Sequence, residues 1–160
     1  MKKSIASLLL ALSLVAPVAF AQTTVKIPAD KPFASITVPD GWIAAVNGDI
    51  INIKSEEDEV LIDVIVTRPD MLGPSNDKAF AMLKVKPDFD SFKDSKTTIN
   101  GMPATVVTVD CKGDSGPMKL TLTSLEVTKD KGVMFIQRGE GMEENKEVIT
   151  AILNSVVAEK

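Results

Sequence analysis

A series of short apolar segments with a period of two, separated by turn residues, most constrains the fold of this chain. In residues 118–123, Met and Leu alternate with Lys and Thr, which predicts a strand with one buried and one solvent-exposed face. Residues 60–67 are apolar on both faces, which predicts a central strand that is covered on both sides. Pairs such as Asn100-Gly101 are typical of hairpin turns. The chain is therefore expected to build an antiparallel sheet.

The same pattern predicts eight strands in all. They are expected over residues 33–38, 42–46, 50–54, 60–67, 97–99, 104–111, 118–123 and 133–137. A first helix should begin with Ser75 or Asn76 as its N-cap and reach about Lys86, where Pro87 closes it.

A second, amphipathic helix is expected near the C-terminus. Glu143 and Glu144 fall in its first turn, where the helix dipole favours carboxylates. Its apolar stripe consists of Ile149, Ile152, Leu153, Val156 and Val157. Four strands, a helix, four strands and a helix predict an α+β domain in which a central helix and a C-terminal helix cover an antiparallel sheet.

The first residues have the composition of an export signal. Lys2 and Lys3 precede an apolar stretch, and an A-x-A site ends at Ala21, so residues 1–21 are expected to be cleaved. Residues 22–32 are expected to form a flexible leader, either a loose strand or a linker, and residues 33–158 a single domain with one core. The mature protein should therefore be periplasmic or secreted.

Charge and hydropathy exclude two kinds of partner. The chain has 18 basic and 22 acidic side chains; two of the basic ones lie in the signal, which leaves 16 and a net charge of −6. Nucleic acids and anionic lipid surfaces bind clustered Lys and Arg, so neither is expected as a partner. No segment after the signal is apolar over a sufficient length for stable membrane insertion.

The composition also disfavours most catalytic sites. The chain has no His, no Tyr and one Cys, which removes the commonest general base and makes a zinc, copper or iron site improbable. Residues 113–117, GDSGP, resemble the nucleophile loop of trypsin-like proteases, but no histidine is available to accept the serine proton. The loop is expected to be a hairpin turn. The protein is expected to be non-catalytic and to have no cofactor.

Cys111 is expected to be a small buried side chain in a strand. The neighbouring carboxylate of Asp110 should raise the pKa of its thiol and so reduce its reactivity.

An acidic run is the first candidate binding feature. Glu56, Glu57, Asp58 and Glu59 occupy an expected turn between two strands. They would form either a low-affinity calcium site or a solvated turn, and the D-x-D-x-D-G pattern of calcium loops is missing.

Three further residues are candidates for binding. Arg68 and Arg138, the two arginines of the chain, each follow an apolar strand. They would form a shared anion site or be solvated separately, and strand direction places them at opposite edges of the sheet. Trp42 is either part of the core or an exposed interaction residue. Asp63 lies within an apolar strand, so it must face water or have a partner.

Two short motifs resemble those of PsbP-like domains. The sequence from Phe33 to Val38-Pro39-x-Gly41-Trp42 is similar to the apolar strand and P-x-G-W start of that family, and residues 99–104, I-x-G-x-P-A, resemble a later strand entry. Ser155 within the closing amphipathic helix also fits the family. The resemblance covers residues 33–157.

This resemblance implies an α-β-α sandwich and a mostly non-catalytic family. Its members include extrinsic photosystem II subunits that help to retain calcium and chloride, a Ran-binding transport factor and exported bacterial proteins. We therefore expect an envelope accessory module that binds another envelope protein. The alternative is a periplasmic protein that binds calcium or a small ligand, and a carboxylate-based hydrolase has no sequence basis.

Overall fold

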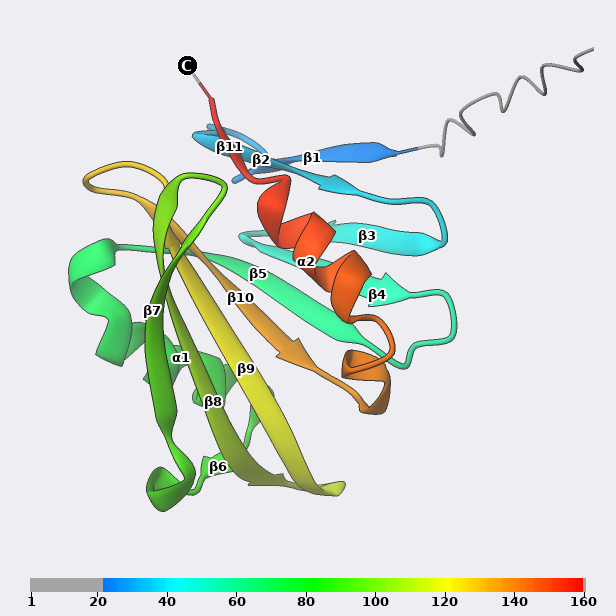
Figure 1. The fold of residues 1–160 in the computed structure, drawn as a ribbon, viewed down its shortest axis with the longest axis vertical. Coiled ribbons are helices and arrows are strands. Elements are labelled where there is room, and N and C mark those ends of the chain that lie inside the picture. The colour runs from blue at the N-terminus through cyan, green and yellow to red at the C-terminus, as the bar shows by residue number, and fades with distance from the viewer. Residues whose placement is uncertain (1–21, 160) are drawn as a thin grey trace, which may run out of the picture.

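The computed structural model describes residues 22–159, so the expected export signal lies outside the described residues. An antiparallel sheet of eight strands forms the centre (Figure 1). Its order is β3 (Trp42–Asn47), β4 (Ile50–Ser55), β5 (Leu61–Thr67), β10 (Gly132–Arg138), β9 (Gly116–Glu126), β8 (Met102–Gly113) and β6 (Lys86–Pro87), with β7 (Lys93–Ile99) also paired to β8. None of the helices among the described residues is both long and apolar enough to span a bilayer.

A second sheet of three strands packs over one face of the first. It has the order β1 (Thr23–Ile27), β2 (Ala34–Val38) and β11 (Val157–Ala158), all antiparallel. Of the two alternatives for the leader, a loose strand or a linker, residues 23–27 form a strand, and it is a regular one because all five of its residues are in register with β2. Its alternation of exposed residues with buried Val25 and Ile27 is that of a strand with one buried face.

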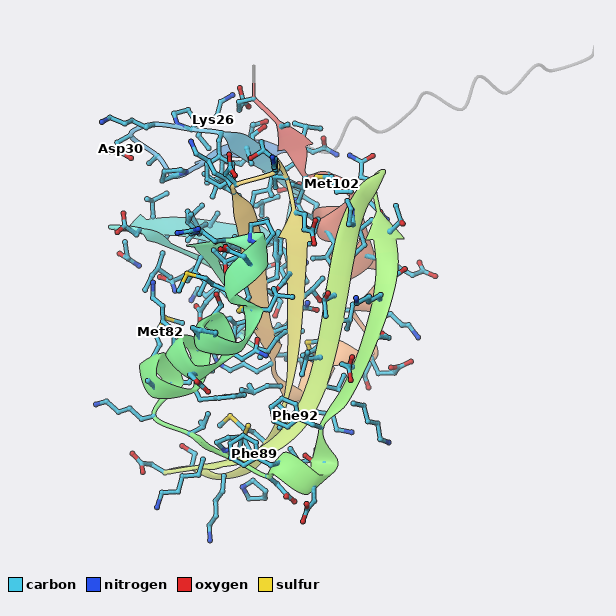
Figure 2. All side chains as sticks on the ribbon, turned by 90° about the vertical axis from the view of Figure 1, so that its left-hand side faces the viewer. Lys26, Asp30, Met82, Phe89, Phe92 and Met102 are labelled. Carbon is cyan, nitrogen blue, oxygen red and sulfur yellow. The ribbon has the colours of Figure 1, made fainter. Side chains whose placement is uncertain are left out.

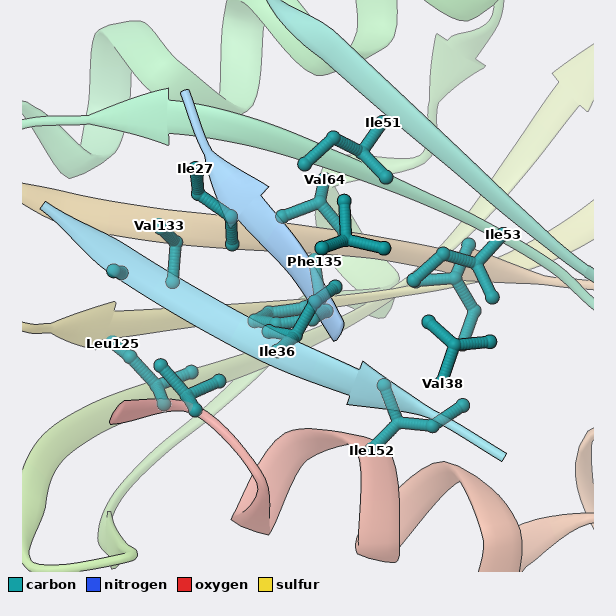
Figure 3. Close-up of a cluster of buried hydrophobic side chains, with 14 of the residues drawn as sticks. Ile27, Ile36, Val38, Ile51, Ile53, Val64, Leu125, Val133, Phe135 and Ile152 are labelled. Carbon is teal, nitrogen blue, oxygen red and sulfur yellow. The ribbon is translucent and has the colours of Figure 1, made fainter. Parts of the chain in front are cut away.

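The first core lies between the two sheets. Ile27 and Ile36 of the small sheet pack with Val64 and Phe135 of the large one, and Ile152 of helix α2 (Lys146–Asn154) closes the side (Figure 3). Phe135 is fully buried.

The second core lies on the opposite face of the large sheet. Helix α1 (Leu72–Leu83) places Ala79 and Phe80 against Ile65, Leu120 and Met134. The two helices thus cover opposite faces, as expected for the α+β fold class (Figure 1). The difference from a simple α-β-α sandwich is that α2 shares its face with the small sheet.

Several expected strands are confirmed. β5 is buried on both faces, and β10 is an interior strand. The Asn100-Gly101 pair forms the hairpin turn between β7 and β8, with positive φ angles of 47° and 78°. In β9 the expected alternation holds up to Leu122, but Thr123 is also buried, because it lies beside Phe135 on the face that the small sheet and α2 cover.

The first helix begins earlier than predicted and ends earlier. A 3-10 turn, η1 (Pro69–Met71), runs into α1 at Leu72, and Pro74 is tolerated because first-turn N–H groups have no partner within the helix. Ser75 is not the N-cap; its hydroxyl donates to the Met71 carbonyl at 2.6 Å. Lys84 adopts a left-handed conformation, φ 54°, and ends the helix before Pro87.

The second helix is shorter than its apolar pattern. A 3-10 turn, η3 (Glu140–Met142), precedes it, so Glu143 and Glu144 lie outside α2. Ile149, Ile152 and Val156 are buried, but Val157 belongs to β11 and is 49% exposed. The chain leaves the helix after Asn154 because its last residues pair with β2.

Candidate functional site

The acidic run forms the turn between β4 and β5, and we call residues 56–59 the acidic turn. Ser55 and Val60 close it, since the Ser55 N–H donates to the Val60 carbonyl at 3.1 Å and the Ser55 hydroxyl accepts from the Val60 N–H at 3.1 Å. All four carboxylates are exposed, and Asp58 forms an ion pair with Lys54 at 2.8 Å. The turn is therefore shaped by its neighbours and not by bonds among its own carboxylates.

A glycine-containing loop packs against this turn. The Gly141 N–H donates to the Glu59 carbonyl at 3.2 Å. At Gly139, with φ 130°, a Cβ atom would lie 2.0 Å from the Glu59 carbonyl oxygen, so no other residue fits there without moving the turn. The two segments line a hollow of about 540 Å³ with the carboxylates of Glu57, Asp58, Glu59, Glu140 and Glu144.

The hollow is acidic, but its carboxylates do not converge. Within residues 22–159, no group of three or more Asp, Glu, Cys or His side chains is arranged to hold a metal ion. A calcium site needs six to eight oxygen ligands at short range. The structure thus concentrates negative charge around the calcium candidates Glu56, Glu57, Asp58 and Glu59. It does not arrange their oxygens as a set of calcium ligands.

The structure brings Trp42 next to the acidic turn, which the sequence did not predict. A smaller hollow of about 250 Å³ is lined by Asp40, Gly41, Trp42, Ser55, Glu56, Glu57, Glu59 and Asn145. Trp42 is half-buried and packs on the first core, so it is neither a core residue nor a fully exposed one. Its ring lies at the start of β3, beside three of the four candidate carboxylates.

The two arginines do not form a shared anion site. β5 and β10 pair antiparallel, so Arg68 and Arg138 lie at opposite ends of adjacent strands. Arg68 forms an exposed ion pair with Asp70 at 2.9 Å. Arg138 donates to the buried carboxylate of Asp63 at 2.6 Å. Its role is to compensate a buried charge.

Asp63 is the centre of a hydrogen-bond network across four strands. Its second oxygen accepts from the Asn52 side chain at 2.6 Å, and Asn52 in turn accepts from Asn47. Of the two alternatives for Asp63, a wet face or a partner, the structure shows the second, since its carboxylate is buried and accepts from Asn52 and Arg138. The sequence did not indicate that Arg138 and Asn52 are those partners, because they come from strands that pair only in the folded sheet.

The remaining polar candidates are structural. Cys111 is buried in β8, and burial raises the pKa of its thiol, with a further contribution from the Asp110 carboxylate. The GDSGP segment forms the turn between β8 and β9, where Gly116 has φ 113°. Both features agree with the sequence interpretation.

Large apolar side chains are exposed on β3 and in the turn before β7, as well as at Met71 and Val157. Ile43 and Val46 on β3 are 51% and 48% exposed. Phe89, in the 3-10 turn η2 (Phe89–Ser91), is 71% exposed and stacks on Phe92 with ring centroids 5.6 Å apart. Figure 2 shows both rings together at one end of the molecule. Phe92 also meets the buried Phe80 edge-on, so the stack continues from the second core to the surface.

Comparison with known proteins gives a fold and no sequence family. No protein-family model matches the chain, and no curated protein matches it. Cyanobacterial PsbP from Synechocystis sp. PCC 6803 is similar in structure, with a TM-score of 0.57 and 11% identity over 92% of this chain and 99% of that protein.

Two other solved structures are also similar. LpqN, involved in cell envelope biogenesis of Mycobacterium tuberculosis, has a TM-score of 0.51 and 13% identity over 89% of this chain and 92% of that protein. A Bacteroides thetaiotaomicron protein has a TM-score of 0.53 and 11% identity over 80% of this chain and 46% of that protein. At such identities the likeness is one of fold, and it supports the PsbP-like domain that the sequence motifs indicated.

Proposed function

We propose that this chain, which has a PsbP-like fold, is an exported, non-catalytic accessory protein of the cell envelope that binds another envelope protein. The similar fold of LpqN, a protein of cell envelope biogenesis, is compatible with this role. The residues themselves provide the stronger argument.

The observation that carries the proposal is a contrast between polar and apolar groups. Among the described residues, every buried side-chain nitrogen and oxygen has a hydrogen-bond partner. A catalytic or ligand-binding site commonly keeps such groups available for its substrate. Phe89, Ile43 and Val46 are instead large apolar side chains that are about half exposed or more. Aromatic and aliphatic side chains of this kind are what a protein partner buries.

The experiment is a pull-down from native envelope with the tagged protein, gentle crosslinking and mass spectrometry. The expected result is one partner at stoichiometric yield, and its yield should fall when Phe89, Ile43 and Val46 are replaced together by Ser. The matched control replaces three exposed polar residues of β7, Ser95, Thr97 and Thr98, by Ala. A clean protein without a partner would contradict the proposal.

Binding of calcium or a small cationic ligand is the second candidate, because five carboxylates line the larger hollow. A ligand that binds the native state alone raises the midpoint of thermal unfolding. Calcium should therefore raise the midpoint in the wild type and not after Glu57, Asp58 and Glu59 are replaced by Gln, Asn and Gln. An equal effect of calcium on both proteins would move the site elsewhere.

A further inference from the structure

β3 is the end strand of the large sheet and pairs with β4 on one side (Figure 1). The Trp42 N–H donates at 3.2 Å to the Pro39 carbonyl in the preceding turn, so it does not bond to β4. Ser55, opposite Trp42, donates to Val60 on the far side of β4. Groups on alternate residues of an antiparallel strand point the same way, so the N–H and C=O groups of Ala44 and Val46 also point outward.

The outward N–H and C=O groups of Ala44 and Val46 have no backbone partner in the part of the chain that the structure describes. We call this side of Trp42–Asn47 the β3 edge. It carries the sequence WIAAVN, without a charged residue or a proline. Natural proteins protect edge strands with charges, Pro or a bulge, because a bare edge accepts another strand.

β7 at the other end of the sheet shows such protection. It pairs with β8 alone and carries Lys93, Asp94 and Lys96, all exposed. The same molecule thus protects one edge with charges and leaves the other without them. Ile43 and Val46, each about half exposed, extend from the two faces of the uncharged edge.

We propose that the β3 edge binds an extended segment of the partner protein as an added strand, and that this segment is apolar in the middle and basic at its ends. This inference rests on the proposed function and names the surface and the chemistry of the partner. Main-chain hydrogen bonds to Ala44 and Val46 would supply affinity, and alternate side chains would contact Ile43 and Val46.

The charge around β3 determines this choice of occupant. At its start, the smaller hollow gathers Asp40, Glu56, Glu57 and Glu59 beside Trp42. At its end, Asp49 follows in the turn to β4. Both ends of the edge are therefore acidic, and a strand with Lys or Arg at its ends complements them.

A second copy of this chain fits the edge poorly. Two β3 strands paired antiparallel would place the start of each beside the end of the other. Asp40 of one copy would then approach Asp49 of the other at both ends of the pair, and like charges across strands are destabilising. The acidic ends thus favour a foreign, basic segment over self-association.

The test uses the fluorescence of Trp42. The chain has one Trp and no Tyr, so its tryptophan emission reports on the β3 edge alone. The probe is the capped peptide RVTVTVR, and the controls are EVTVTVE, with acidic ends, and RVTPTVR, in which Pro removes a central N–H. We expect saturable emission change with RVTVTVR and at least about tenfold weaker binding of each control.

Protein variants locate the binding. Val46→Pro removes an outward N–H and no ladder bond, so it should weaken RVTVTVR binding at least about tenfold, whereas Val46→Thr, which keeps the N–H and the branched shape, should stay within about twofold. Val46→Lys is the second variant should the proline disturb folding; it keeps the backbone and repels the basic peptide. Replacement of Glu56 and Glu57 by Gln should weaken the binding of RVTVTVR. The binding of EVTVTVE should not become weaker.

Three results would overturn the inference. These are absence of saturable RVTVTVR binding, equal binding of the acidic peptide, and a concentration-dependent Trp42 change without peptide that accompanies dimer formation. The pull-down separates this inference from the proposed function. A partner captured equally by wild type and Val46→Pro would retain the function and overturn the β3 edge, whereas no partner with either protein would contradict the function itself.

Discussion

The two faces of the central sheet are covered in different ways. One face meets a second sheet and α2, and its core contains Ile, Val, Leu and one central Phe. The other meets the single helix α1 at one end, where Met134, Met118 and Cys111 join the core, and at its other end carries the network around Asp63. The first face is therefore closed by apolar packing, whereas the second combines an adaptable core with a buried ion pair.

The largest effect is expected from the two central residues of β10. Phe135 and Met134 are adjacent and fully buried, and they point to opposite faces. Phe135→Ala should lower the free energy of unfolding by about 4 kcal/mol and Met134→Ala by about 3 kcal/mol, since both leave cavities. Urea unfolding measures both values. A larger loss at Met134 would reverse the comparison and make the α1 face the more tightly packed one.

The ion pair on the second face should give the next effect. Arg138→Met leaves the Asp63 carboxylate buried without its cation and should lower the free energy of unfolding by about 3 kcal/mol. Adding Asp63→Asn should recover part of this loss, because the uncompensated charge is removed. Urea unfolding of the two single variants and the double variant tests the coupling. Additive losses would show that the pair contributes no interaction energy.

Cys111 gives the second face a pH dependence in the alkaline range. Burial, together with Asp110, raises the thiol pKa in the native state, so the native state holds this proton more tightly than the unfolded chain does. Stability from this group is full below the unfolded pKa of about 8.5 and declines as the pH rises through the raised native value. Unfolding of the wild type should therefore become easier above that pH relative to Cys111→Ala. Equal pH profiles would contradict the assignment.

Much of this comparison could be read from the sequence, and the exceptions have a common cause. The period of two in β5 and β9 and the Asn100-Gly101 turn are local patterns, and they identified the strands and the two helices. β11 was missed because Val157 continues the apolar pattern of the second helix, and it becomes a strand only by pairing with β2 across most of the chain. β1 was expected only as part of the leader, and it becomes a regular strand by pairing with the nearby β2.

The candidate site follows the same rule. The acidic turn was visible in the sequence because its residues are consecutive. Its packing against Gly139 and Gly141 and its position beside Trp42 were not, because those contacts join segments far apart in the chain. The partners of Asp63 were missed for the same reason, since a register between strands determines them.

The smallest effect on stability is expected at the ion pair that joins β1 to the residue after β11. Lys26 of β1 donates to Glu159, which follows β11, and this bond, with a further one from Ser35, lowers the pKa of the Glu159 carboxyl. A lowered pKa means that its contribution is present above the unfolded value of about 4.3 and is lost as the pH falls through the native value. Glu159→Gln should therefore remove a small contribution to stability that the wild type loses at acid pH. The stability at neutral pH should stay almost unchanged, because solvent screens this ion pair. Amide hydrogen exchange of β1 measures this. Faster exchange of β1 at neutral pH in the variant would mean that this one ion pair, and not the apolar contacts of Val25 and Ile27, holds the small sheet on the first face.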